Sequence, residues 1–225
     1  MFDYQKVRLV GITKPVNDDV NSASDLISYC ARVSNPSNQT NFETSDKLLK
    51  YCINHKHWSI FETVSVVMEI ETTRDIGRQI LRHRSFSFQE FSQRYAEKLD
   101  RFPTDDYREC RLQDTKNRQN SLVNNNDMLA ANWLAQQIKV ENAAKAAYEW
   151  AIKAGIAKEV ARAVLPEGLT MSRMYMSGTL RSWIHFIEVR TDISTQSEHR
   201  DIANKAMEIL KNEFDFLKEY LVNES

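Results

Sequence analysis

A run of arginines between residues 74 and 94 is the part of this chain best suited to chemistry. Arg74, Arg78 and Arg82 are four residues apart, so a helix would place them on one face, where like charges repel mildly. Arg82 and Arg84 have no acidic residue within one helical turn, and we expect Arg94 to add a third unpaired guanidinium. Because the planar guanidinium matches phosphate oxygens in pairs, the run predicts a site for a phosphorylated small molecule.

Small hydrogen-bonding side chains fill the gaps between these arginines. They are Ser85, Ser87, Gln89, Glu90 and Ser92. Such a density of donors and acceptors suits recognition of a polar ring better than it suits bulk solvent. We expect Glu90 to be ionised by its basic neighbours, and His83, which stands between two arginines, to be neutral. A solvated basic surface is the alternative interpretation of the same residues.

The same segment carries a long pattern: Arg82-His83-Arg84, seven further residues, Ser92, and then Arg94-Tyr95. This pattern resembles the signature of the flavin-dependent thymidylate synthases. Other stretches look like segments of that family in the same order, namely ARVS at 31–34, HWSIFE at 57–62, EVAR at 159–162 with LP at 165–166, and LRS at 180–182 through Arg190. The resemblance spans about residues 5–215.

The resemblance implies a homotetramer of α/β subunits that binds FAD and deoxyuridine monophosphate (dUMP) at subunit boundaries. Methylenetetrahydrofolate would supply the carbon and NADPH would reduce the flavin. Carried over position by position, the residues implied to contact dUMP are Gln79, Arg82, Glu90, Ser92, Arg94, Arg162 and Arg190. Those implied to contact FAD are Ser59, Arg82, His83, Arg84, Glu90, Thr179, Arg181 and His185.

Arg190 is the expected catalytic residue. The resemblance places it against the uracil edge, where a fixed guanidinium stabilises developing negative charge without a proton transfer. Arg94 and Arg162, from separate segments, are expected to clamp the nucleotide phosphate. None of the three cysteines falls within the matched pattern, and Ser92 has no base beside it in the sequence. We therefore interpret Ser92 as a binding residue rather than a nucleophile.

Hydrophobic periodicity predicts the elements that position these residues. Alternation predicts strands over residues 6–13, 62–72 and 170–177; helical spacing predicts helices over 24–33, 45–53, 73–81, 127–154, 158–164, 180–189 and 198–221. Residues 100–126 are polar and are expected to form a surface excursion. No repeat and no linker rich in Gly, Pro or Ser divides the chain. We expect residues 1–225 to form a single domain of α/β (α+β mixed) class, with an antiparallel or mixed sheet flanked by several helices and with long C-terminal helices.

The charge balance limits the alternatives. With 30 Lys and Arg against 31 Asp and Glu, the net charge of −1 speaks against a free-standing nucleic-acid binder. The second functional class is nevertheless a nucleotide- or nucleic-acid-binding module that uses the loop at 82–95 without catalysis, with Phe86, Phe88, Phe91 and Tyr95 as a stacking surface. A third is a family-like scaffold that binds flavin or nucleotide but has lost turnover.

Two further expectations concern metals and location. His55 and His57 lie close together, but no third ligand accompanies them, so we expect no metal site, with His57 lining the site and His55 at the surface. His199 is expected to be a solvent-exposed helix residue.

No apolar stretch reaches the roughly 18–20 residues that span a membrane. Charged residues near the start oppose a secretory signal, so we expect a cytoplasmic protein, or one in the host cytoplasm if a virus encodes it.

Overall fold

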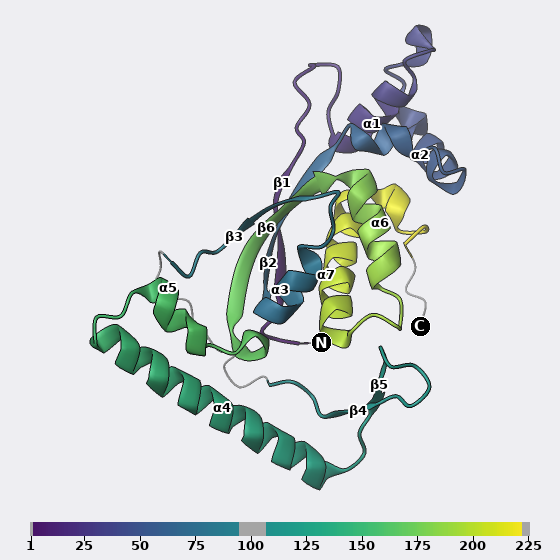
Figure 1. Cartoon of the computed structure of the whole chain (residues 1–225). Coiled ribbons are helices and arrows are strands. Elements are labelled where there is room, and N and C mark those ends of the chain that lie inside the picture. Colours follow the sequence, from purple (N-terminus) through teal and green to yellow (C-terminus); the bar gives the residue numbers. More distant parts are fainter. Residues whose placement is uncertain (1, 95–106, 222–225) are drawn as a thin grey trace.

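A four-stranded antiparallel sheet lies at the centre of the computed structural model, which describes residues 2–94 and 107–221. Its strands, in spatial order, are β1 (Lys6–Ile12), β2 (Ser65–Thr73), β6 (Met171–Thr179) and β3 (Ser87–Glu90) (Figure 1). β2 and β6 form the long central pair, with every residue of one strand in register with the other. β1 and the short β3 are therefore the two edges of the sheet.

One face of this sheet is apolar and forms the core. Val66, Met68 and Ile70 of β2 point to this face, and Met174 and Met176 continue it on β6. The period of two is what a strand covered on one side requires, because successive side chains point to opposite faces. Three helices cover the apolar face (Figure 1): α3 (Arg74–Ile80), α6 (Leu180–Arg190) and α7 (Ser197–Glu213).

Two local features shape the edges of the sheet. Phe86, just before β3, packs so closely on Gly178 of β6 that a Cβ atom at residue 178 would lie 2.5 Å from the Phe86 ring. This position therefore requires glycine. At the other edge, β1 shifts its register between Leu9 and Gly11, which forms a bulge in the strand.

The N-terminal helices lie together at one end of the sheet. They are α1 (Ala23–Ala31) and α2 (Ser45–Asn54), followed by the 3-10 turn η3 (Trp58–Glu62). Beyond the end of α2, Lys56 adopts a φ of 58°, a left-handed conformation that usually belongs to glycine. The other 3-10 turns are η1 (Pro36–Asn38), η2 (Phe42–Thr44), η4 (Arg162–Val164), η5 (Glu167–Leu169) and η6 (Asp215–Leu217).

An arm extends away from the sheet (Figure 1). It consists of the hairpin of β4 (Arg111–Gln113) and β5 (Ser121–Val123), the long helix α4 (Asp127–Lys153) and the short helix α5 (Lys158–Ala161). The Asn126 side chain caps α4, and Gly155, with a φ of 80°, ends it as the sequence predicts. Trp133 and Gln137 hold α4 against the chain by donating to the backbone carbonyl of Arg108 at 3.1 and 2.9 Å.

The predicted fold class is confirmed, but the structure differs from the prediction in three regions of the chain. The last predicted helix is too long, because Phe214 adopts an extended backbone (φ −133°, ψ 96°) that ends α7 and turns Phe214 and Phe216 into the core. β3 forms where the sequence predicts a loop. The hairpin of β4 and β5 forms within the predicted excursion at 100–126, and residues 100–106 of this excursion lie outside the described residues. Strands of three or four residues are too short for alternation to reveal them.

Candidate functional site

Helix α6 turns one polar face away from the core. Arg181, His185 and Glu188 are spaced by four and three residues, so they share this face, while the opposite side of the helix is buried. The Thr179 hydroxyl caps the helix by accepting from the backbone N–H of Ser182 at 3.3 Å. The cap fixes where α6 begins and therefore where these side chains point.

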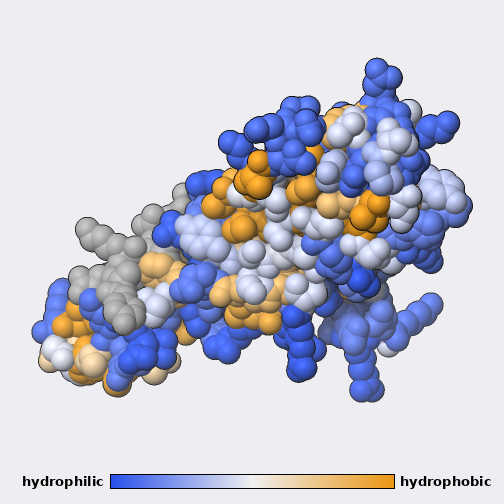
Figure 2. Space-filling view, turned by 90° about the horizontal axis from the view of Figure 1, so that it is seen from above, coloured by the Kyte–Doolittle hydropathy of each residue, from blue (hydrophilic) through white to orange (hydrophobic). Residues whose placement is uncertain are grey.

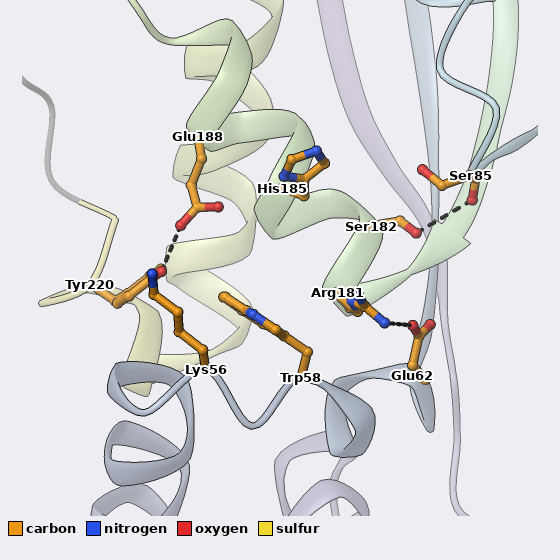
Figure 3. A pocket seen from close by; sticks show the side chains of 9 residues that line it. All are labelled: Lys56, Trp58, Glu62, Ser85, Arg181, Ser182, His185, Glu188 and Tyr220. Carbon is orange, nitrogen blue, oxygen red and sulfur yellow. Dashed lines mark hydrogen bonds and ion pairs between the residues drawn. The ribbon is translucent and has the colours of Figure 1, made fainter.

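This face of α6 lines a cavity of about 590 Å³, which we call the α6 pocket (Figure 3). Its lining residues are Lys56, Trp58, Glu62, Ser85, Arg181, Ser182, His185, Glu188 and Tyr220. Arg181 donates to Glu62 at 2.8 Å, and the Tyr220 hydroxyl donates to Glu188 at 2.6 Å. Cationic groups, hydroxyls and aromatic rings from separate parts of the chain thus meet in one cavity.

The structure brings some of the expected flavin contacts to this pocket. Arg181 and His185 line it directly (Figure 3). Ser59 and Arg84 are exposed, and each adjoins a lining residue in the chain. Thr179 lies at the first turn of α6, where its hydroxyl already serves as the helix cap.

A second group of expected site residues lies at the C-terminal end of α6. There, Arg190 Nε donates to His83 Nε2 at 3.0 Å. Burial, together with the charges of Arg190, His185 and Arg82, lowers the pKa of His83 to about 4, so the ring is neutral near pH 7 and accepts this hydrogen bond. The predicted neutral state of His83 is confirmed. Burial and the charge of Arg82 also lower the pKa of Arg190, although a guanidinium stays charged in proteins.

Arg82 and Arg84 are exposed, and neither makes a salt bridge with any residue of 2–94 or 107–221. Unpaired guanidiniums next to one another create a positive potential that attracts anions. Arg74, by contrast, lies 3.6 Å from Glu90, which also accepts from another side chain in β6. The unpaired part of the arginine run is therefore confined to residues 82–84.

Gln79, on α3, lies between this group and α7. Its Nε2 donates to Gln196 Oε1 at 2.8 Å, and its Oε1 lies 3.3 Å from His199 Nδ1. The prediction of a solvent-exposed residue at 199 is wrong, because His199 is fully buried. α7 packs against α3 and α6, so its face at residues 199, 202, 203 and 206 belongs to the interior. Burial first, and then the charge of Arg190, lower the pKa of His199 to about 3.

Ser92, Arg94 and Arg162 form a third group beside α5, and Glu90 lies at the end of β3 that leads to it. Arg94 Nε lies 3.1 Å from Glu159 Oε2, and Arg162 Nε donates to the backbone carbonyl of Glu159 at 3.3 Å. The expectation that Arg94 is unpaired is wrong, because the chain after β3 runs to α5 and brings it to an acid distant in sequence. The Ser92 hydroxyl accepts from the Arg94 backbone N–H at 3.3 Å. Arg94 and Arg162 thus both bind Glu159, Arg94 at its carboxylate and Arg162 at its backbone carbonyl.

The α6 pocket and the group around Arg190 lie near the start of β3, and the group around Arg94 lies near its end. Figure 1 shows β3 running from the side of α6 toward α5, so residues 82–84 precede it and Arg94 follows it. Tyr95, the last residue of the signature, lies outside the described residues. Residues that sequence comparison assigns to one ligand are thus divided between two places on a single chain.

Sequence reasoning missed several residues of these groups. Glu188 follows His185 by three residues, so helical spacing on α6 was a usable signal for it. Lys56 and Tyr220 reach the α6 pocket only through tertiary packing, which no local pattern reveals. His57, expected to line the site, is exposed outside this pocket, with its ring 6.0 Å from that of Tyr51. Within the described residues, no three His, Cys, Asp or Glu side chains are placed to hold a metal ion.

Comparison with known proteins decides the family. The family model described as "Thymidylate synthase complementing protein" matches residues 16–214. The chain is 51% identical over 207 residues to a protein named probable flavin-dependent thymidylate synthase from Paramecium bursaria Chlorella virus 1, covering 92% of this chain and 94% of the relative. It belongs to the flavin-dependent thymidylate synthase family. A Synechocystis sp. member of this family is 49% identical over 212 residues, covering 92% and 95% of the two chains. The predicted family, its thymidylate synthase and methyltransferase class, and its FAD cofactor are confirmed.

A solved structure shows the same fold. The UMP/dUMP methylase PolB from Streptomyces cacaoi, bound with 5-Br dUMP, superposes with a TM-score of 0.79 at 24% identity, covering 97% of each chain. This likeness confirms the mixed α/β fold that the sequence predicts for a flavin-dependent thymidylate synthase.

Proposed function

We propose that this chain catalyses the reductive methylation of dUMP to dTMP, with methylenetetrahydrofolate as the carbon donor and NADPH as the reductant. The observation that carries the proposal is the group around Arg190. Its guanidinium donates a hydrogen bond to the neutral ring of His83, and Arg82 and Arg84, which flank His83 in the sequence, form no salt bridge within the described residues. A positive site of this kind suits an anionic pyrimidine nucleotide. Relatives that share about half of all residues bear this activity in their names.

The α6 pocket and its rim are the proposed flavin site. The Arg181 guanidinium and the hydroxyls of Ser85 and Ser182 suit a diphosphate, and the Trp58 ring offers a flat apolar surface to a ring system. The other proposed flavin contacts are Ser59, Arg82, His83, Arg84, Glu90, Thr179 and His185. When bound, FAD supplies the redox chemistry by carrying reducing equivalents from NADPH to the nucleotide.

Arg94 and Arg162 are the proposed clamp for the nucleotide phosphate. Both guanidiniums bind Glu159, Arg94 through the carboxylate and Arg162 through the backbone carbonyl, which restricts their motion and lowers the entropic cost of assembling the clamp. A phosphate offers more oxygens and more negative charge than this exposed carboxylate, so it can replace Glu159 as the partner of Arg94. The remaining proposed dUMP contacts are Gln79, Arg82, Glu90, Ser92 and Arg190.

Arg190 is the proposed catalytic residue. Its Nε bond to His83 fixes the plane of the guanidinium while its remaining N–H groups stay available to a ligand. Because the partner is a neutral ring and not a carboxylate, the positive charge is not neutralised. A fixed charge of this kind stabilises negative charge that builds up on the uracil ring as its carbon attacks the one-carbon unit.

Ser92 is proposed to bind the nucleotide and not to attack it. The structure gives its hydroxyl one bond, from the Arg94 backbone N–H, and places no hydrogen-bonded base at Ser92 among the described residues. A serine without a base to take its proton is a poor nucleophile near neutral pH.

A homotetramer is the proposed working form. The arm exposes apolar side chains, including Met128, Leu134, Ile138 and Trp150 on α4, with exposed fractions of 38–75%. Figure 2 shows hydrophobic surface on the projecting end of the molecule that carries α5 and the C-terminal end of α4. Patches of this kind mark protein interfaces. Association also offers a way to bring Arg94 and Arg162 of one chain to the Arg190 group of another, which supports the proposal.

The whole chain, residues 1–225, is proposed to act as one domain. Among the helices in the described part of the chain, none is long and apolar enough to cross a bilayer. We propose that the enzyme acts in the cytoplasm, or in the host cytoplasm if a virus encodes it; the viral origin of one relative supports the second possibility. The alternative of a nucleic-acid-binding module is less well supported, because the net charge is −1.

The proposed reaction is tested with the purified full chain. Added FAD should give a bound-flavin absorbance band that bleaches with NADPH under anaerobic conditions. Further addition of dUMP and methylenetetrahydrofolate should return the band and yield dTMP. Flavin binding without dTMP formation would leave a scaffold that has lost turnover, and nucleotide binding without flavin would favour the non-catalytic binding module.

A further inference from the structure

Glu198, on the first turn of α7, is a fully buried carboxylate that the proposed reaction does not use. Arg111 Nη2 donates to its Oε1 at 2.5 Å, and Arg108 Nη1 lies 3.7 Å from its Oε2. Burial opposes ionisation of Glu198, but the charge of Arg108 and the bond and charge of Arg111 outweigh it and lower its pKa. Both arginines come from the segment that leads from residue 107 into β4.

The ionised carboxylate of Glu198 fixes the direction of the hydrogen bonds that lead to Gln79. A carboxylate can only accept, so Gln196 must turn its Nε2 toward Glu198 Oε2, at 2.9 Å. Gln196 Oε1 then faces Gln79 and accepts from Gln79 Nε2 at 2.8 Å. Gln79 Oε1, an acceptor, faces His199 Nδ1 at 3.3 Å, so this nitrogen carries the ring hydrogen. Each amide in the series has one orientation that satisfies its partners.

We propose that Glu198, held ionised by Arg108 and Arg111, is a positioning residue that fixes the Gln79 side chain for binding of the pyrimidine nucleotide. The inference rests on the proposed function, in which Gln79 contacts dUMP. With its inner partners fixed, Gln79 keeps one N–H and one acceptor lone pair for a ligand. An amide free to flip would present the wrong group half of the time.

A purely structural role explains this arrangement poorly. Replacing a buried ion pair by apolar residues of similar size is often neutral or stabilising, so burial of Glu198 is weak evidence for a role in stability. Glu198 and its arginine partners instead begin a series of hydrogen bonds through Gln196 to Gln79, which is an expected dUMP contact. The segment at 107–111 is thereby assigned a role in nucleotide affinity, although it contributes none of the residues of the signature.

A double-mutant cycle on the full-length enzyme tests the proposal. Arg111→Met removes the strong partner of Glu198, and Gln79→Ala removes the residue on which it is proposed to act. In the otherwise unmodified enzyme, Arg111→Met should raise KM for dUMP about five- to tenfold, with kcat and KM for NADPH within about twofold. In the Gln79→Ala background, the same change should alter KM for dUMP less than about twofold. Arg111→Lys should restore part of the affinity, and Arg118→Met, an exposed arginine of the same hairpin, should have no effect.

An equal rise of KM in both backgrounds, or no rise in either, would overturn the positioning role. If Arg111→Met fails to fold, Gln196→Met breaks the same series without removing a charge and should give the same coupling to Gln79. Dissociation constants for dUMP, measured by calorimetry on the same proteins, test the positioning role of Glu198 separately from the proposed reaction. Lack of turnover in the unmodified protein refutes the proposed reaction, whereas absence of coupling in the dissociation constants refutes the positioning role.

Discussion

Replacing Lys56 by glycine should stabilise the protein while weakening its hold on FAD. Lys56 follows α2 with a φ of 58°, and its backbone N–H donates to the Ile53 carbonyl at 3.0 Å, which closes the last turn. An L-residue in this conformation costs roughly 1–2 kcal/mol, and this position after a helix is usually glycine. The side chain nevertheless lines the α6 pocket, so the strain places a cation beside the proposed flavin site.

The expected size follows from two opposing contributions. Lys56→Gly removes the conformational cost of roughly 1–2 kcal/mol but adds about 0.5–1 kcal/mol of chain entropy in the unfolded state. The free energy of unfolding should therefore rise by about 0.5–1 kcal/mol, or about 1–4 °C in Tm for a chain of this length. Lys56→Ala is the matched control, because it removes the same cation and keeps the strained backbone. Both variants should bind FAD about two- to fivefold more weakly, as expected for one exposed charge.

Urea unfolding and a flavin fluorescence titration on the two variants measure these effects separately. If Lys56→Gly is no more stable than Lys56→Ala, the left-handed backbone carries no cost and the stability reasoning is refuted. If both variants bind FAD as tightly as the unmodified chain, Lys56 does not contribute to the flavin site.

Four further changes test other parts of the molecule. Arg190→Ala should lower kcat/KM at least about a hundredfold, because it removes the fixed charge, while the free energy of unfolding changes by only about 1 kcal/mol. Gly178→Ala should destabilise the fold by about 1–3 kcal/mol in urea unfolding, because the new Cβ meets an aromatic ring at 2.5 Å. Leu134→Asp combined with Ile138→Asp should convert the proposed homotetramer to smaller species in light scattering. Burial lowers the pKa of His199 to about 3, against a usual 6.5, so the unfolded chain binds a proton at this residue before the folded chain does. The free energy of unfolding should therefore fall as pH drops below 6.5, by up to about 1.4 kcal/mol per pH unit. His199→Phe should reduce this pH dependence in urea unfolding.

Three of these changes have a control variant elsewhere in the chain. Arg8→Ala, on the edge strand β1, removes an exposed guanidinium and should leave turnover intact. Gly11→Ala should be nearly neutral, since the new Cβ would lie 3.9 Å from the Val67 Cβ, an ordinary van der Waals contact. Lys139→Asp adds an acid to α4 without removing an apolar side chain and should keep the proposed homotetramer. Near-normal turnover in Arg190→Ala, or an unchanged pH slope in His199→Phe, would contradict the corresponding reasoning.

The parts of the fold that sequence reasoning predicts correctly are those with long, regular periodicity. β2 alternates through Val66, Met68 and Ile70, and α4 is bounded by an Asn cap and a left-handed glycine, so local physics alone defines them. The break of α7 at Phe214 is different. The helical spacing of apolar residues continues past it, and only the packing of two phenylalanines into the core decides against the helix.

The site divides in the same way. A family pattern identifies Arg190 and His83, but the bond between them joins residues more than a hundred positions apart, which no local pattern can reveal. His199 looks like a surface residue because its neighbours in sequence are charged, yet its burial is decided by the helices that pack against α7. The partner of Arg94, Glu159, is likewise set by where the chain leads after β3.

The bulge in β1 protects the protein against sheet-to-sheet aggregation. An edge strand offers a row of unpaired N–H and C=O groups to any other chain, and a flat, apolar edge can seed fibrils. β1 breaks its own register between Leu9 and Gly11 and carries the exposed charges of Lys6 and Arg8, so a second copy finds neither a straight edge nor an uncharged one. Addition of a further strand from another copy of the chain is therefore disfavoured at this edge of the sheet.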